Sequence, residues 1–138
     1  MSAAIRAGTV YFLVVFAIAF GLGVVRTGLI IPRIGVLAAV FAEAAVLLPL
    51  SWWVCSGLVR RFAVPPARSA RAVMGLLAFA LLMIAELALA VLLFGRTPAQ
   101  HWASYRGIAE QVGLAAQLLF AAMPMLVQRE NKFRRRLQ

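Results

Sequence analysis

The sequence predicts an all-α membrane protein, in which four antiparallel transmembrane helices form an up-down bundle. Three observations support this fold class: 64% of the 138 residues are hydrophobic, only 13% are charged, and the apolar residues gather in long segments. A soluble domain averages about 45–50% apolar residues, so this chain has more apolar surface than one core can hide. A soluble four-helix bundle would also need polar helix faces, which these segments lack.

Each apolar segment has roughly the 17–25 residues that a membrane-spanning helix needs. The first predicted helix, residues 8–25, follows Arg6 and contains an Ala17-Ile18-Ala19 triplet, and this combination is also typical of a signal peptide. We interpret this segment as a retained helix. The other predicted helices cover residues 34–59, 72–94 and 108–127.

Short connections rich in Gly, Pro and Arg separate the predicted helices. They include residues 26–28 with 32–33, residues 64–66, and residues 95–98. Because connections this short join neighbouring helices, consecutive helices are expected to run antiparallel. Residues 1–138 are therefore predicted to form a single transmembrane domain, which ends in a basic tail over residues 128–138.

The net charge of +10 arises from 14 Lys and Arg residues against 4 acidic residues. The basic residues flank apolar segments, which favours contact with the lipid bilayer and its anionic headgroups over binding to nucleic acid. Ten of them lie in the N-terminus, the second connection and the tail, and four in the other two connections. This bias predicts a multi-pass protein of a bacterial-type inner membrane with both termini in the cytoplasm. The tail residues expected to contact anionic lipid are Arg129, Lys132, Arg134, Arg135 and Arg136.

Two carboxylates lie inside otherwise apolar segments, and such residues indicate a functional site by default. Glu43 lies about nine residues from the outer end of the second helix, and Glu86 about eight residues from that of the third. At about 1.5 Å per residue, both lie roughly 12–14 Å below the outer interface, as does Gln117 on the fourth helix. Glu110 lies two turns before Gln117 on nearly the same face. These four residues are predicted to bind a proton, a cation or a ligand.

Two carboxylates at one depth can share a proton, bind a cation or relay protons, and at least one is expected to stay protonated. The first helix is apolar at this depth, near Phe16 and Ala17, so the predicted layer involves the other three helices. A structural alternative remains open. A Glu hydrogen-bonded to Gln117, or to a carbonyl freed by Pro49, would hold the helices together without binding anything.

Five basic side chains of the outer connections are candidates for a vestibule above the carboxylates or for a lipid-headgroup site. They are Arg26, Arg33, Arg96, His101 and Arg106. Taken singly, each is also typical of a charge that extends to the membrane interface. The segment 98–106 is amphipathic and is expected to lie along the outer interface. With one histidine and one cysteine, Cys55, the sequence identifies neither a cofactor nor a metal site.

The sequence favours a small transporter or channel-like protein in which Glu43 and Glu86 bind a proton or a cation. One alternative is a non-catalytic partner subunit of a larger membrane complex. Another is a lipid- or quinone-handling membrane enzyme, which is less favoured because no catalytic motif is present. A homo-oligomer is expected, because four helices barely enclose a pathway. A cavity at the acids would favour transport, and a pocket that joins them to Arg96 or His101 would favour the enzyme.

The predicted orientation can be tested with single cysteines in a Cys55→Ser background. We expect Ser104→Cys to react with a membrane-impermeant maleimide from the outside, and Ser69→Cys only after the cytoplasmic side is opened. The reverse pattern would contradict the orientation, and reaction of each cysteine from both sides would indicate dual topology.

Overall fold

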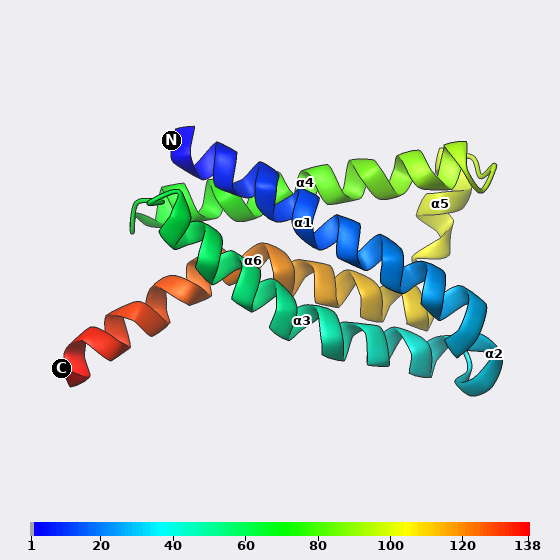
Figure 1. Cartoon of the computed structure of the whole chain (residues 1–138). Helices are drawn as coiled ribbons and strands as arrows, with labels where there is room; N and C mark the ends of the chain where they lie inside the picture. The colour runs from blue at the N-terminus through cyan, green and yellow to red at the C-terminus, as the bar shows by residue number, and fades with distance from the viewer. Residues whose placement is uncertain (1) are drawn as a thin grey trace.

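The computed structural model describes the backbone of residues 2–138, and the side chains of that range other than those of residues 128–135. These residues form helices and no strands. Four helices are long and apolar enough to cross a membrane, and they cover Ser2–Ile34, Val36–Arg61, Arg68–Leu92 and Ile108–Val127. The predicted all-α fold class is confirmed, and the chain is a multi-pass membrane protein (Figure 1).

The first span is longer than predicted, because residues 26–33 continue it instead of forming a loop. Helix α1 (Ser2–Val25) leads directly into a π-helical turn, η1 (Arg26–Ile30), and a short helix, α2 (Ile31–Ile34). Pro32, which has no N–H to donate, lies in α2 directly after this π-helical turn. Gly35 then reverses the chain at φ 86°, a conformation that glycine adopts without strain.

The other predicted helices differ from the observed ones mainly at their ends. Helix α3 spans Val36–Arg61, and α4 spans Arg68–Leu92. The amphipathic segment contains α5 (Pro98–Ser104), where Thr97 and Gln100 form a capping box. Helix α6 spans Ile108–Leu137 and takes in the basic tail, because Arg, Lys, Gln and Glu are good helix formers. Of the predicted lipid-binding tail, Arg136 is exposed, and the side chains of Arg129, Lys132, Arg134 and Arg135 lie outside the described ones.

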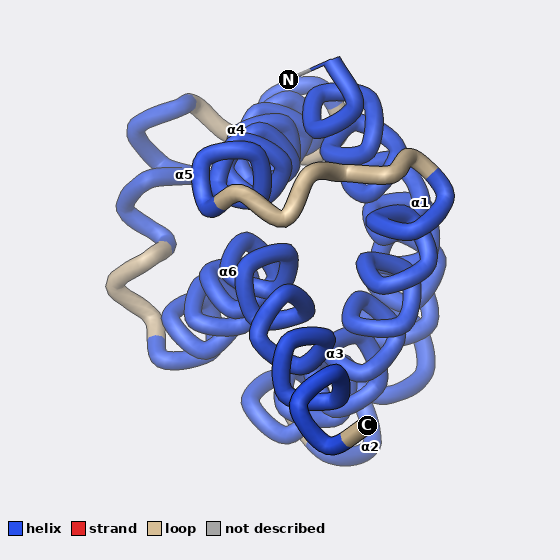
Figure 2. The backbone as a smooth tube through the Cα atoms, turned by 90° about the vertical axis from the view of Figure 1, so that its left-hand side faces the viewer, coloured by secondary structure: helices blue, strands red, loops and turns tan. Residues whose placement is uncertain are grey.

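The four spans form a ring in which α1 packs against α3 and α4, and α6 packs against the same two helices. Figure 2 shows this arrangement along the bundle. Helices α3 and α4 therefore lie diagonally opposite each other, although they are consecutive in the chain. Antiparallel contacts occur between α1 and α3 and between α4 and α6, whereas α1 with α4 and α3 with α6 run parallel (Figure 1).

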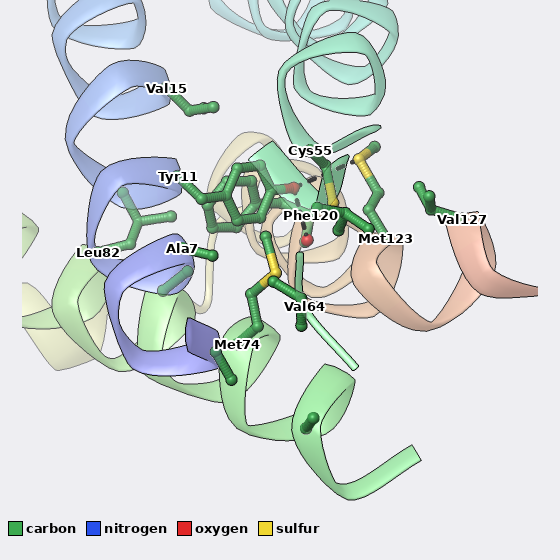
Figure 3. Packing of buried hydrophobic residues seen from close by; sticks show 14 residues of the cluster. Ala7, Tyr11, Val15, Cys55, Val64, Met74, Leu82, Phe120, Met123 and Val127 are labelled. Carbon is green, nitrogen blue, oxygen red and sulfur yellow. Dashed lines mark hydrogen bonds between the residues drawn. The ribbon is translucent and has the colours of Figure 1, made fainter. Parts of the chain in front are cut away.

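The buried core occupies the half of the bundle that contains the N-terminus and the connection between α3 and α4. There the ring of Tyr11 on α1 stacks on that of Phe120 on α6, with 4.2 Å between centroids (Figure 3). The Tyr11 hydroxyl donates a 2.9 Å hydrogen bond to the Phe120 carbonyl. That carbonyl lacks its usual helical partner because the residue four positions later is Pro124. Tyr11 thus satisfies a backbone acceptor inside an apolar environment.

Arg71 stabilises the same half of the bundle, which contains the buried core, through hydrogen bonds to backbone carbonyls. Its buried guanidinium donates hydrogen bonds to the carbonyl oxygens of Val64, Pro65 and Pro124, at 3.5, 3.1 and 3.2 Å. One side chain of α4 therefore connects the chain turn before it to the proline kink of α6. This half is closed by packing and by satisfied polar groups.

Gly75 permits the close approach of α4 to α6, because a methyl group there would overlap the carbonyl oxygen of Ala121. We expect Gly75→Ala to lower the free energy of unfolding in detergent by about 1–3 kcal/mol. Gly57→Ala is the matched control: it meets no atom within 4 Å and should stabilise α3 by up to about 1 kcal/mol through helix propensity. Equal thermal stabilities of the two variants would contradict this packing.

Candidate functional site

A cavity of about 650 Å³ lies between the four spans, in the half of the bundle away from the buried core. It is within the ~300–1,000 Å³ range of small-molecule sites. Every span contributes to its wall, through residues 15–28, 40–51, 82–94 and 113–120. The wall is mainly apolar, with aromatic side chains such as Phe16, Phe20, Phe94 and Phe120. A few polar side chains interrupt it.

Arg26 and Glu43 form an ion pair on the wall of this cavity. The Nη1 of Arg26 donates to Oε2 of Glu43 at 2.5 Å, and the carboxylate side chain is only 14% exposed. Arg26 is the first residue of η1, which packs against α3. The π-helical turn thus joins the first span to the second at the level of Glu43. A charge-assisted hydrogen bond of this kind compensates two charges that would be costly alone.

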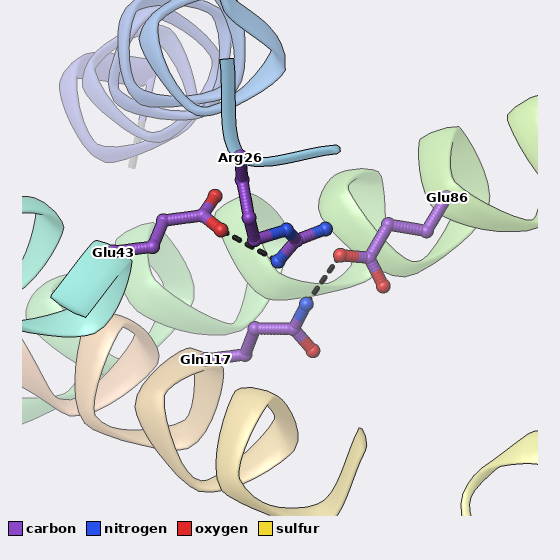
Figure 4. A network of polar contacts seen from close by, with 4 residues as sticks. All are labelled: Arg26, Glu43, Glu86 and Gln117. Atoms are coloured by element: carbon purple, nitrogen blue, oxygen red, sulfur yellow. Dashed lines mark hydrogen bonds and ion pairs between the residues drawn. The ribbon is translucent and has the colours of Figure 1, made fainter. Parts of the chain in front are cut away.

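Glu86 and Gln117 form a second pair across the antiparallel contact between α4 and α6. The Gln117 Nε2 donates a hydrogen bond to Oε1 of Glu86. Figure 4 shows the Arg26 guanidinium between the two carboxylates, both of which point toward it. Glu86 lies within electrostatic range of Arg26 and of Glu43. The structure thus places Glu43, Glu86 and Gln117 around one cavity, together with Arg26.

Two buried polar atoms of this cluster have no hydrogen-bond partner among the described residues. They are Nε of Arg26, a donor, and Oε1 of Gln117, an acceptor. Buried polar atoms in proteins are nearly always paired, and exceptions point to a bound water, ion or ligand. The cluster therefore retains unused hydrogen-bonding capacity beside an apolar cavity.

Tyr105, in the connection between α5 and α6, interacts with Glu86. Its hydroxyl forms a hydrogen bond with the Glu86 carboxylate, and its ring meets those of His101 and Trp102 edge-on. Burial raises the pKa of Tyr105, and the charge of Glu86 and the hydrogen bond to it raise it further. Glu86 is thereby linked to the short helix at the end of the bundle.

Several predicted site residues lie away from the cavity. Glu110 is exposed in the first turn of α6, where its charge favours the helix N-terminus. Arg33, Arg96 and Arg106 are exposed, His101 is partly exposed, and none of the four lines the cavity. Of the five basic residues of the predicted vestibule or lipid-headgroup site, Arg26 is the one that lines the cavity, and the vestibule itself stays a prediction.

Two partners of the carboxylates were not predicted from the sequence. The first span was expected to be apolar at this depth, yet Arg26 of that span pairs with Glu43. Arg26 could have been predicted as this partner, because a carboxylate inside a membrane needs a positive charge nearby. Arg26 is the basic residue that directly follows the first apolar segment. Tyr105 is the second missed partner, and no spacing in the sequence indicates its contact with Glu86.

Comparisons with protein-family models, with curated proteins and with solved structures find no match for this chain. Its function is therefore inferred from the geometry and charge of the site.

The contact between Tyr105 and Glu86 predicts a coupled titration. In a Tyr11→Phe background Tyr105 is the only tyrosine, and its phenol should ionise above the usual pKa of 10.0. Glu86→Gln removes a negative charge and should lower this pKa, whereas Glu43→Gln, the control, should change it less. The readout is tyrosinate absorbance against pH in detergent. A pKa of Tyr105 that does not respond to Glu86→Gln would contradict the contact.

Proposed function

We propose that this chain is a small transporter or channel-like membrane protein whose intramembrane carboxylates bind a proton or a cation. The observation that carries this proposal is the cavity of about 650 Å³ that reaches Glu43, Glu86 and Gln117 at once. Carboxylates used only to hold helices together need no such space around them. An accessible chamber is what a transported species or a coupling ion requires.

The charges of Arg26, Glu43 and Glu86 indicate which species would neutralise the cluster. Arg26 compensates Glu43 through a direct ion pair, whereas the hydrogen-bond partners of Glu86 among the described residues are the neutral amide of Gln117 and the phenol of Tyr105. With all three ionisable groups charged, the cluster has one excess negative charge. Because net charge is costly within a membrane, one proton on Glu86 or one monovalent cation beside it gives the stable state.

The two alternatives receive less support. A lipid- or quinone-handling enzyme was expected to join the acids to Arg96 or His101, and neither residue lines the cavity. A partner subunit would need no cavity beside its carboxylates, whereas Glu43 and Glu86 both line one. The homo-oligomer stays a prediction, and the cavity wall is made by side chains of a single chain.

The proposed orientation decides which side of the membrane the cavity is nearer to. With both termini in the cytoplasm, the cavity lies in the outer half of the membrane, and the core around Tyr11 and Arg71 closes the inner half. This arrangement corresponds to an outward-facing state. Transport would then require the helices of the inner half to separate. Pro124 interrupts the hydrogen bonding of α6, so α6 would bend there most easily.

The proposal predicts that a cation gradient drives proton movement through Glu86. Purified protein is reconstituted in liposomes with a trapped pH-sensitive dye, and gradients of sodium, potassium and an aromatic organic cation are imposed in turn. We expect at least one gradient to change the internal pH, and Glu86→Gln to reduce this rate at least roughly tenfold, because the only uncompensated charge is lost. Glu110→Gln, an exposed residue outside the cavity, is the control and should retain the rate.

Proton movement that is equal in the original protein and Glu86→Gln, for every gradient, would overturn the proposal. That outcome would favour the partner-subunit alternative, in which the carboxylates stabilise helix contacts only.

A further inference from the structure

Arg26 does more than hold two helices together, because it sets the net charge of the cavity. We propose that the cavity binds an amphipathic aromatic organic cation, and that the Arg26–Glu43 ion pair restricts this ligand to a single positive charge. This inference rests on the proposed function and adds to it the ligand class and a specificity-determining residue.

The size and walls of the cavity favour an organic cation over a bare metal ion. A hard cation bound by protein alone takes six or more oxygen ligands, and the cluster offers two carboxylates and one amide oxygen. Most of the remaining wall is aliphatic or aromatic. An apolar body with one positive centre would fill this wall, with its charge near Glu86 and its rings against Phe16, Phe20 or Phe120.

The position of Arg26 makes it an internal counter-ion of the site. Its guanidinium has five N–H donors, and among the described residues it makes one hydrogen bond, to Glu43. It stands between Glu43 and Glu86 (Figure 4) and cancels one of their two negative charges. A single uncompensated charge remains for a ligand, beside the unpaired Oε1 of Gln117.

Each variant should prefer the ligand whose positive charge neutralises the net charge of its cluster. The cluster of the original protein has a net charge of one negative unit and should prefer a monocation. Arg26→Gln leaves two negative units and should prefer a dication, whereas Glu43→Gln leaves none and should bind neither. The double variant Arg26→Gln/Glu43→Gln returns to one negative unit and should recover the monocation. These differences follow from the cost of net charge in an apolar site.

The probes are a pair of aromatic cations with nearly the same shape and different charge. N-methyl-phenylpyridinium carries one positive charge, and methyl viologen, a dimethyl bipyridinium, carries two. Binding of each to the purified full-length chain in detergent is measured by isothermal titration calorimetry, with Glu110→Gln as the control variant. The reported quantity is the ratio of the two dissociation constants, which cancels uniform losses of affinity.

We expect the original protein and Glu110→Gln to prefer the monocation, and Arg26→Gln to shift the ratio toward the dication by roughly tenfold or more. Glu43→Gln should lose both ligands, and the double variant should regain the monocation preference. Gln117→Glu adds a negative charge without breaking the ion pair, and it should shift the ratio as Arg26→Gln does. This variant tests the charge rule if either partner of the ion pair proves necessary for folding.

Two results separate this inference from the function on which it rests. Monocation binding that depends on Glu86, with a ratio unchanged in both Arg26→Gln and Gln117→Glu, would overturn the charge rule and leave the proposed function intact. An original protein that binds neither probe, but still couples a sodium or potassium gradient to proton movement through Glu86, would overturn the organic ligand class. No coupling to any cation would overturn the proposed function itself.

Discussion

An ionised carboxylate among apolar side chains needs a compensating charge nearby, and in this protein Arg26 meets that need for Glu43. The ion pair accounts for much of the surrounding structure. It holds the end of the first span against α3, close to the single-residue reversal at Gly35. It also leaves Glu86 without a cationic side chain in direct contact among the residues that the structure describes. The chemistry available to the cavity depends on this unequal division of charge between two acids.

The two halves of the bundle satisfy their polar groups in different ways. In the core half, Tyr11 takes the carbonyl freed by Pro124, and Arg71 donates to three backbone carbonyls. In the cavity half, Nε of Arg26 and Oε1 of Gln117 stay unpaired among the described residues. Complete pairing stabilises one arrangement, whereas incomplete pairing beside an open volume is what a binding site requires.

The fold class could be predicted from composition because a chain this apolar has few stable solutions in a membrane. Backbone groups in a bilayer must be satisfied within helices, so the length of each apolar segment nearly determines its helix. Prediction failed where apolar and turn-forming residues were mixed. Residues 26–33 contain Gly28 and Pro32, yet they continue the first span through a π-helical turn, and the chain reverses only at Gly35.

The sequence by itself determined the number of spans, their approximate limits and the common level along the helices at which Glu43, Glu86 and Gln117 lie. These properties depend on local hydrophobicity and on a fixed rise per residue. The tertiary structure alone decided that α3 and α4 lie diagonally opposite each other, that Arg26 stands between their carboxylates, and that Tyr105 interacts with Glu86. Such contacts join side chains from different helices, and they depend on how each helix is rotated and packed. Helix rotation is set by close contacts such as that of Gly75 with Ala121, which no linear spacing of residues reveals.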